Sequence, residues 1–378
     1  ERSDQQRAGG GVTSPHADTP PAPAPLRGPH TLLATTGGAE DVLLCGPAAR
    51  AASAGSSRVT MLCRPTGVAA GRLLEGVDEV LAWEPPWSAA DPAPAAGAEA
   101  LLEPIRRCGA DAAAVIGTPE REVLALTLVL RLAGVPRTAA VVDPAGALVE
   151  HPVAPDPTRH EARTNLAVLA ALGFALPPSG HERLQVRLPA EDAGDVARDV
   201  ADAPMPRRMR GRRRIRRDRV VVHPAASLGR GPAALSGERL DAIIDQLIDD
   251  GWNVLVTGST QAPHPPARPR MVDLIGRTDL AGLAAVVAGC VAAVVGSATP
   301  AQLAAAVGTP VVSVLGSDAS WSRRRPWRVP AIRLRADPAP GPGLAPFDEV
   351  TPEAVGAAVR SLTGPPSLFA AEPGVRRR

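Results

Sequence analysis

Hydrophobic positions along the chain alternate between short β-branched or leucine-rich runs and longer alanine-rich stretches. The short runs have the length and composition of buried strands, and the stretches between them have those of helices. In the first half this pattern predicts strands near Thr31–Thr35, Val59–Cys63, Val77–Trp83, Ala112–Ile116 and Thr138–Val142. Strands that alternate with helices in this way form a parallel sheet.

The same alternation restarts in the second half with a buried strand, Val220–His223. The next predicted helix carries apolar residues at i, i+3, i+4, i+7 and i+8, namely Leu240, Ile243, Ile244, Leu247 and Ile248. Gly251 is predicted to end it in the left-handed conformation. The further predictions are strands Asn253–Val256, Val291–Val295 and Val311–Leu315, helices Leu280–Gly289 and about Ala301–Val307, and a last helix with Thr351 as N-cap and Pro352 in its first turn.

Two kinds of segment interrupt this alternation. Residues 1–28 are rich in Pro, Gly and Ala without periodicity, so we expect a disordered tail. The segment Pro204–Arg219 carries Arg207, Arg208, Arg210, Arg212, Arg213, Arg214, Arg216, Arg217 and Arg219. Such a run of like charges repels itself and is typical of an extended, solvated linker.

The expected organisation is therefore two-part. We predict a tail (1–28), an N-terminal Rossmann-like domain (29–200), an Arg-rich linker (201–219), a C-terminal Rossmann-like domain (220–364) and a second tail (365–378). The fold class is α/β of the GT-B type, in which two Rossmann-like parallel-sheet domains face a cleft. Ligands of such folds bind outside the carboxyl ends of the strands.

Composition supports this fold and narrows the function. The chain has 378 residues, 45% of them hydrophobic, but aromatic residues make up only 2% and tyrosine is absent, so Ala, Val, Leu and Ile must fill the cores. All basic side chains are arginines, and the net charge of +2 argues against a protein that binds polyanions over its whole surface.

Neither a metal site nor a membrane span is predicted. The cysteines at 45, 63, 108 and 290 do not have metal-ligand spacing. No uninterrupted apolar stretch approaches the roughly 20 residues of a spanning helix, and the first residues lack a signal-peptide layout. We therefore expect a cytoplasmic protein without a metal or cofactor.

Three loops in the second half follow predicted strands and contain small or hydroxylated residues. The first holds Ser227 and Arg230, the second Thr257 and Gly258, and the third runs from Gly296 to Gln302. Each alone is explained as well by an ordinary strand-to-helix turn. Together they favour an anionic ligand, such as a diphosphate, at helix N-termini.

The first half contains an acidic turn, Gly37–Asp41, ahead of an alanine-rich stretch. A carboxylate at a glycine-rich turn that faces the cleft can act as a general base. A solvated carboxylate that caps a helix is the commoner role for such a residue.

Residues 40–48, Glu-Asp-Val-Leu-Leu-Cys-Gly-Pro-Ala, resemble the Gly-Asp-Val-hydrophobic-x-x-Pro motif of the heptosyltransferases of glycosyltransferase family 9. The resemblance implies that Asp41 is the catalytic base, and Glu40 replaces the preceding glycine. Arg131–Arg137 resembles the family's Ala-Gly-x-Pro-Arg stretch, and His160 with Glu161 resembles its histidine-containing helix start.

The second half follows the family's order as well. The matching segments are the loop after His223 and Pro224, Val254–Gly258, Gly276–Leu280 and Gln302–Pro310, and the resemblance covers Thr31 to Leu362. It implies a donor-binding set of Ser227, Arg230, Thr257, Gly258, Leu280, Ser297, Ala298, Thr299 and Gln302.

This chain departs from the family's closing signature, which reads Asp or Asn, Ser or Thr, Gly, Pro, x, His, Leu. Here residues 297–303 are Ser-Ala-Thr-Pro-Ala-Gln-Leu, so the acid, the glycine and the histidine are all replaced. In the phosphate loop Ala225 stands where the family has glycine, and the basic residue is Arg230.

The function implied by the resemblance is inverting, metal-independent sugar transfer. A nucleotide-diphosphate sugar, ADP-heptose by family default, would give its sugar to a glycan, a lipid-linked acceptor or another hydroxyl acceptor. Asp41 would deprotonate that hydroxyl, and Ser227, Arg230, Thr299 and helix N-termini would stabilise the leaving diphosphate.

Two alternatives stay open at this point. One is a family member that binds nucleotide-sugar or a partner without transfer, because Gln302 and Ser297 lack the ionisable groups of the family motif. The other is binding of an anionic surface, such as lipid headgroups at the inner face of the membrane, through the run from Arg207 to Arg219.

Two further classes are disfavoured. Nucleic-acid binding lacks support because no aromatic residue interleaves with the arginines to stack on bases. A dinucleotide-dependent oxidoreductase lacks support because no GxGxxG loop follows the first predicted strand.

Overall fold

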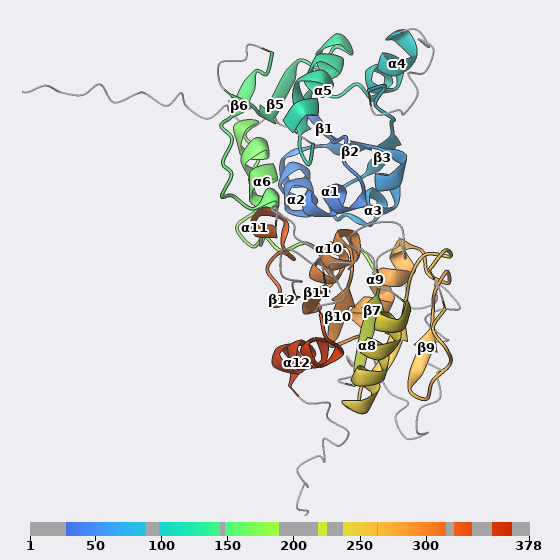
Figure 1. The fold of residues 1–378 in the computed structure, drawn as a ribbon. Helices are drawn as coiled ribbons and strands as arrows, with labels where there is room; N and C mark the ends of the chain where they lie inside the picture. The colour runs from blue at the N-terminus through green and yellow to red at the C-terminus, as the bar shows by residue number, and fades with distance from the viewer. Residues whose placement is uncertain are drawn as a thin grey trace, which may run out of the picture.

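The computed structural model describes residues 28–87, 98–118, 120–143, 148–188, 218–224, 237–262, 264–314, 321–334 and 350–364. The predictions of a tail at each end and of an Arg-rich linker lie outside the described residues, apart from residues 28, 218 and 219. The described chain forms two α/β halves, one above the other in Figure 1.

The described part of the N-terminal half contains six strands and the helices that connect them. Its strands are β1 (His30–Ala34), β2 (Arg58–Cys63), β3 (Glu79–Ala82), β4 (Ala112–Val115), β5 (Arg137–Val141) and β6 (His151–Val153). Its helices are α1 (Ala39–Leu44), α2 (Gly46–Gly55), α3 (Val68–Leu73), α4 (Ala98–Cys108), α5 (Glu120–Leu132) and α6 (Glu161–Ala171), with a 3₁₀ turn at Pro65–Gly67.

The C-terminal half repeats this plan. Its strands are β7 (Arg219–His223), β8 (Asn253–Val256), β9 (Met271–Asp273), β10 (Ala292–Val295), β11 (Val311–Val314) and β12 (Ala331–Leu334). Its described helices are α8 (Gly237–Asp249), α9 (Leu280–Ala288), α10 (Ala298–Ala306), α11 (Trp321–Arg324) and α12 (Pro352–Thr363).

The two sheets have the same topology. Their strand orders are β3-β2-β1-β4-β5-β6 and β12-β11-β10-β7-β8-β9, and every neighbouring pair is parallel. The order reverses between β1 and β4 in one sheet and between β7 and β10 in the other. These are the switch points at which open α/β sheets bind ligands, and the predicted fold class is confirmed.

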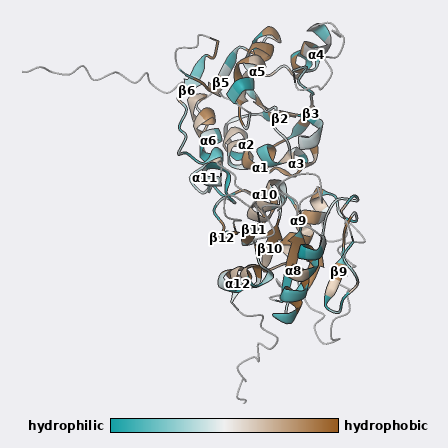
Figure 2. Ribbon diagram, in the orientation of Figure 1, coloured by the Kyte–Doolittle hydropathy of each residue, from teal (hydrophilic) through white to brown (hydrophobic). Residues whose placement is uncertain are grey.

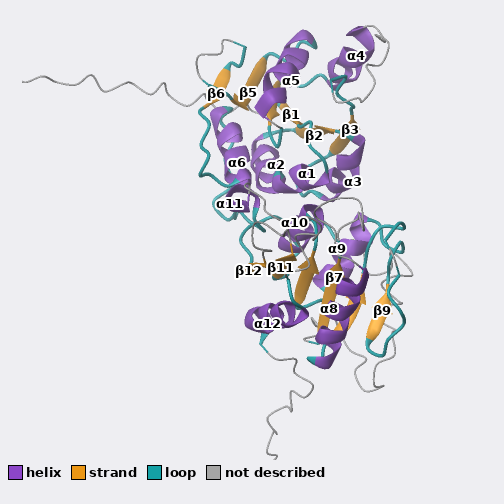
Figure 3. Ribbon diagram, viewed as in Figure 1, coloured by secondary structure: helices purple, strands orange, loops and turns teal. Residues whose placement is uncertain are grey.

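Apolar patterning explains how the helices lie on the sheets. Helix α8 buries Leu240, Ile243, Ile244 and Leu247 against its sheet, and Figure 2 shows its opposite side as hydrophilic. Figure 3 shows helices on both faces of the strands in each half. The small side chains of the alanine- and valine-rich strands let these helices approach closely.

Helix α10 has no solvent-exposed polar face beyond its first turn, because both halves of the molecule cover it. Its residues from Pro300 to Ala306 are buried, and it packs on α1 of the other half as well as on its own sheet. One cluster of buried apolar side chains therefore includes Leu43 of α1 and Leu303 of α10. A helix without a polar face is expected in such a position.

Most of the predicted elements are confirmed, with shifts of one to three residues at their ends. Gly251 has φ of 95° after α8, and Thr351 Oγ1 accepts a hydrogen bond of 3.2 Å from the N–H of Ala354 in α12. The prediction placed the start of α10 at Ala301, but the helix begins at Ala298. Arg219, which the charge pattern groups with the linker, is instead the buried first residue of β7.

Strands β6, β9 and β12 were not predicted. Each has only three or four residues, and none of them is fully buried. All three are edge strands, and a strand at the edge of a sheet needs no strong hydrophobic pattern.

No helix in the described ranges is long and apolar enough to cross a membrane.

Candidate active site

The loop after β1 is fixed by hydrogen bonds to the loop after β4, its neighbour across the switch point. Thr35 Oγ1 donates to the carbonyl of Gly117 at 2.8 Å and accepts from the N–H of Gly37 at 2.9 Å. The N–H of Thr36 donates to Thr118 Oγ1 at 3.2 Å. The turn that leads into α1 is therefore held rigidly at the carboxyl edge of the N-terminal sheet.

Asp41 lies in the first turn of α1, at the end of this loop. Its Oδ2 accepts the N–H of Gly38 at 2.9 Å, so the carboxylate caps the helix. A Cβ atom on Gly37 would overlap the Asp41 side chain, and only a glycine at that position lets the chain pass. Both sequence-based roles of Asp41, helix cap and cleft-facing carboxylate, are compatible with this position.

Arg324, at the end of α11 in the other half, reaches Asp41. Its guanidinium donates from Nη2 to Asp41 Oδ1 at 2.5 Å and from Nε to Glu40 Oε1 at 3.0 Å. The side chains of Arg324 and Asp41 are only 27% and 19% exposed. Burial opposes the charge on Arg324, but the two carboxylates outweigh it and raise the pKa of its guanidinium above the usual value.

Two neighbouring contacts also join the halves. Arg323 pairs with Glu161 at 3.1 Å, and His160 forms a hydrogen bond of 2.9 Å from Nε2 to the carbonyl oxygen of Arg325. We call residues 323–325 the arginine clasp, because each of them contacts the N-terminal half.

His160 is the N-cap of α6 and is held as a neutral ring. Its Nδ1 accepts the N–H of Ala162 at 3.2 Å, which assigns the proton to Nε2, and its ring stacks on Trp327 with centroids 4.0 Å apart. Burial foremost lowers the pKa of His160 to about 4; the bond to Arg325 opposes this, and nearby arginines lower it further.

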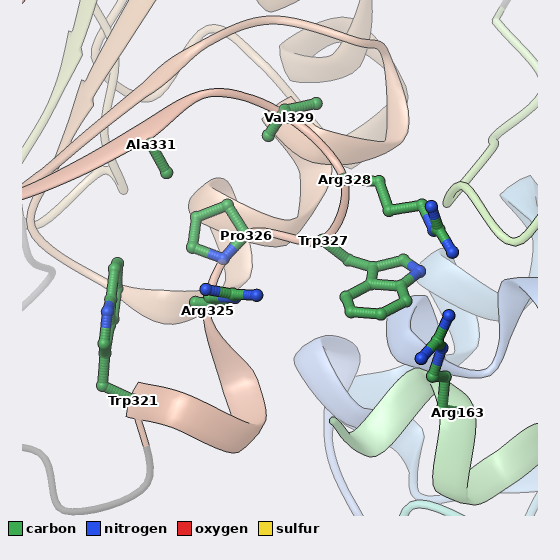
Figure 4. Close-up of a pocket in the computed structure, with 8 residues that line it drawn as sticks. All are labelled: Arg163, Trp321, Arg325, Pro326, Trp327, Arg328, Val329 and Ala331. Carbon is green, nitrogen blue, oxygen red and sulfur yellow. The ribbon is translucent and has the colours of Figure 1, made fainter. Parts of the chain in front are cut away.

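A cavity of about 480 Å³ lies beside the clasp. Figure 4 shows Trp321 and Trp327 on either side of Arg325 and Pro326, with Arg328 and Arg163 close to Trp327. Glu182 pairs with both Arg163, at 3.0 Å, and Arg328. Arg163 comes from α6 and the other lining residues from the C-terminal half, so the cavity is at the interface.

In the C-terminal half, the ends of β7, β8 and β10 meet. His223 Nδ1 lies 2.9 Å from Thr257 Oγ1, and the N–H of Gly296 donates to the carbonyl of His223 at 2.9 Å. Burial lowers the pKa of His223 to about 4, which keeps this ring neutral as well. Thr257 and Gly258, which directly follow β8, are buried.

The other predicted donor residues occupy two helix starts. Leu280 is the first residue of α9, after Asp279, whose carboxylate caps the helix by accepting the N–H of Gly282 at 2.7 Å. Ser297 is the N-cap of α10, its side chain forms no capping hydrogen bond, and Ala298 and Thr299 form the first turn. This nine-residue helix thus presents first-turn N–H groups that its N-cap side chain does not cover.

The family model of glycosyltransferase family 9 (heptosyltransferase) matches residues 133–342, more than half of the chain. The chain belongs to glycosyltransferase family 9. It is a glycosyltransferase, and the resemblance first noted in its motifs is confirmed. The search of curated proteins found no match to the sequence.

Solved structures with the same fold include heptosyltransferases and another family 9 protein. A family 9 glycosyl transferase from Veillonella parvula has a TM-score of 0.68 at 14% identity, covering 90% of this chain and 98% of its own. ADP-heptose heptosyltransferase II of E. coli gives 0.63 at 17%, covering 88% and 98%. A second E. coli heptosyltransferase, solved with ADP, gives 0.60 at 16%, covering 90% and 100%.

Only some of the residues predicted to bind the sugar donor are among the described residues. Ser227 and Arg230 lie outside the described residues. Thr257, Gly258, Ser297, Ala298 and Thr299 lie at the carboxyl edge around the switch point. Gln302 lies one turn further along α10, is buried, and donates from Nε2 to the carbonyl of Arg324 at 2.6 Å.

Sequence reasoning did not identify Arg324 as a site residue. It is separated from Asp41 by 283 positions, and only the tertiary fold brings them together. The signal in the sequence was the run Arg323–Arg325 between Trp321 and Trp327. Among the described residues, no group of three or more His, Cys, Asp or Glu side chains is placed to hold a metal ion.

Proposed function

We propose that this glycosyltransferase transfers a sugar, with inversion and without a metal ion, from a nucleoside-diphosphate donor to a hydroxyl acceptor. The observation that carries the proposal is that Asp41 of the N-terminal half lies in a helix that packs on α10 of the C-terminal half. The carboxylate lies in α1, at the carboxyl edge of one sheet, and α1 packs on α10, whose N-terminus lies at the carboxyl edge of the other sheet.

In the proposed reaction, Asp41 takes the proton from the acceptor hydroxyl. The acceptor oxygen attacks the anomeric carbon from the face opposite the diphosphate, and the bond between that carbon and the phosphate oxygen breaks. The nucleoside diphosphate leaves with the bonding electrons. First-turn N–H groups of α10, with Ser227 and Arg230 of the sequence that follows β7, would stabilise its charge.

The donor class is inferred from the related structures. One E. coli heptosyltransferase was solved with ADP and with ADP-2-deoxy-2-fluoro heptose. We propose an ADP-linked sugar, with heptose as the first candidate, for this chain.

We expect the acceptor to bind along the N-terminal sheet. A cavity of about 610 Å³ is lined by Arg64 after β2, Trp87 after β3, and Arg121, Glu122 and Ala125 of α5 after β4. These residues follow strand ends at the same edge as Asp41. Trp87 offers a flat apolar face, on which a sugar ring can stack, and two arginines can bind anionic groups on an acceptor.

Calorimetric titration of the protein with ADP, GDP, UDP and dTDP tests the donor site. We expect saturable binding of one nucleotide and a loss of affinity of about 10- to 100-fold in Arg230→Ala, since a hydrogen bond to a charged group is removed. Arg72→Ala, which removes an exposed arginine from α3, is the control. Binding of none of the four nucleotides would contradict the proposed donor class.

A transfer assay with the nucleotide so identified tests the base. Asp41→Asn should lower kcat by about 10²- to 10⁴-fold, because the amide cannot accept the proton, while nucleotide affinity stays unchanged. An Asp41→Asn variant with full activity would rule out Asp41 as the base. Analysis of the product anomer decides between inversion and retention.

A further inference from the structure

Arg324 is the centre of a polar network that spans both halves of the protein. Its guanidinium contacts Asp41 and Glu40, which are consecutive residues of α1, at 2.5 and 3.0 Å. Two adjacent carboxylates in a half-buried position repel each other unless a cation lies between them. Arg324 supplies that cation from the opposite half of the molecule.

Gln302 holds the backbone of Arg324. A helix leaves its last carbonyl groups without partners in the helix, and the carbonyl of Arg324, the last residue of α11, accepts Gln302 Nε2 at 2.6 Å. Gln302 is 1% exposed, and its Oε1 has no hydrogen-bond partner among the described residues. An apolar side chain would fill this site without burying an unpaired oxygen, so the contact to Arg324 is the physical reason for an amide here.

The network leaves Asp41 oriented but still able to act as a base. Arg324 contacts Oδ1 and the N–H of Gly38 contacts Oδ2. Each carboxylate oxygen has two lone pairs, so both oxygens can accept one more hydrogen.

We propose that Arg324 is a positioning residue for Asp41, and that Gln302 in turn positions Arg324. This inference rests on the proposed function, in which Asp41 is the base. Glu40 and Gln302 are two of the positions at which the sequence departs from the family motifs, and both contact Arg324. These two departures are therefore connected through Arg324, next to the base.

Kinetics of single variants test the proposal. Arg324→Gln should lower kcat on the order of 10- to 100-fold through misplacement of the carboxylate, with little change in the KM for the donor. Gln302→Ala should lower kcat in the same way by a smaller amount.

Two further variants separate positioning from general damage to the interface. Arg323→Gln removes another ion pair between the halves from the same helix but does not touch Asp41, so its kcat should stay close to that of the unmodified protein. Gln302→His can donate a ring N–H to the Arg324 carbonyl and should retain more activity than Gln302→Ala. An unchanged kcat in Arg324→Gln would overturn the proposal, as would equal losses in Gln302→His and Gln302→Ala.

A chemical readout tests the network without any activity. Carbodiimide-driven coupling of an amine to carboxylates, read by mass spectrometry, should label Asp41 several-fold faster in Arg324→Gln and Gln302→Ala than in the unmodified protein or Arg323→Gln. Equal labelling in all four proteins would overturn the inference. If the unmodified protein transfers no sugar with any nucleotide donor, the proposed function fails, and the labelling pattern still decides whether Gln302 and Arg324 fix Asp41.

Discussion

At the scale of single residues, the position of Asp41 depends on glycines beside it that have no side chain. Gly37 lies so close to Asp41 that a Cβ atom would overlap its side chain. The neighbouring Gly38 donates its N–H to Asp41, but a Cβ there would meet Thr66 Oγ1 at an ordinary 3.6 Å. The space around the chain therefore excludes a side chain at Gly37 and accommodates a Cβ atom at Gly38.

Gly37→Ala should displace the Asp41 carboxylate. We expect a loss of stability of about 1–3 kcal/mol from overpacking and a fall in the transfer rate on the order of 10²-fold from misplacement of the base. Urea unfolding and initial rates measure the two effects. Gly38→Ala is the matched control and should stay close to the unmodified protein; equal behaviour of the two variants would show that close approach at Gly37 is not what fixes Asp41.

At the scale of elements, α10 joins the two sheets into one core. It packs on its own sheet and on α1, and its alanines keep the helices close together. The first turn of the same helix presents the N–H groups proposed to bind the diphosphate, and its next turn carries Gln302. Packing, donor binding and the orientation of Asp41 are thus linked through one helix.

Ala304→Leu should strain the packing around α10, since Ala304 is fully buried in this helix. We expect a loss of about 1–3 kcal/mol in the free energy of unfolding, because a close-packed interior does not accommodate extra methylene groups. The same substitution at the exposed Ala357 of α12 should change stability by no more than about 0.5 kcal/mol. Chemical denaturation of both variants measures the difference, and equal stabilities would contradict tight packing around α10.

At the scale of the whole molecule, the two halves are held together by apolar contact and by the arginine clasp. The apolar cluster that includes Leu43 and Leu303 is continuous through both halves. Around it, the clasp adds two ion-pair sites and the bond from His160 to Arg325. A large apolar interface restricts relative motion of domains, and the clasp adds a contact that responds to pH.

Stability should fall as pH decreases from about 6.5 to about 4. Burial is the main cause that lowers the pKa of His160 from its ordinary 6.5 to about 4. Within this window the unfolded chain binds a proton at His160 that the folded chain does not, so acidification favours unfolding. His160→Gln should flatten the dependence in part, because His223 has a pKa of about 4 by the same cause. Thermal unfolding midpoints between pH 4 and 7 test this; an unaltered slope in the variant would contradict it.

The sequence by itself determined the fold class and the position of most elements. Alternating apolar runs and alanine-rich stretches specify buried parallel strands and their covering helices, because each element must bury its own apolar face. Local chemistry also sufficed for Gly251, Thr351 and the placement of Asp41 at a glycine-rich turn, since turns and caps depend on neighbouring residues only. Short strands such as β12 were not predicted, because they form by pairing with a neighbouring strand and have no distinct hydrophobic pattern of their own.

Only the tertiary structure decided what surrounds Asp41. The motif indicated the residue, but its cation, Arg324, lies 283 positions away, and no local pattern encodes a contact over that separation. The same is true of Gln302. The motif shows only that it replaces a histidine, whereas the fold shows that its amide donates a hydrogen bond to the carbonyl of Arg324. Secondary structure follows from near neighbours along the chain, whereas an ion pair between two halves exists only once both sheets have formed and packed.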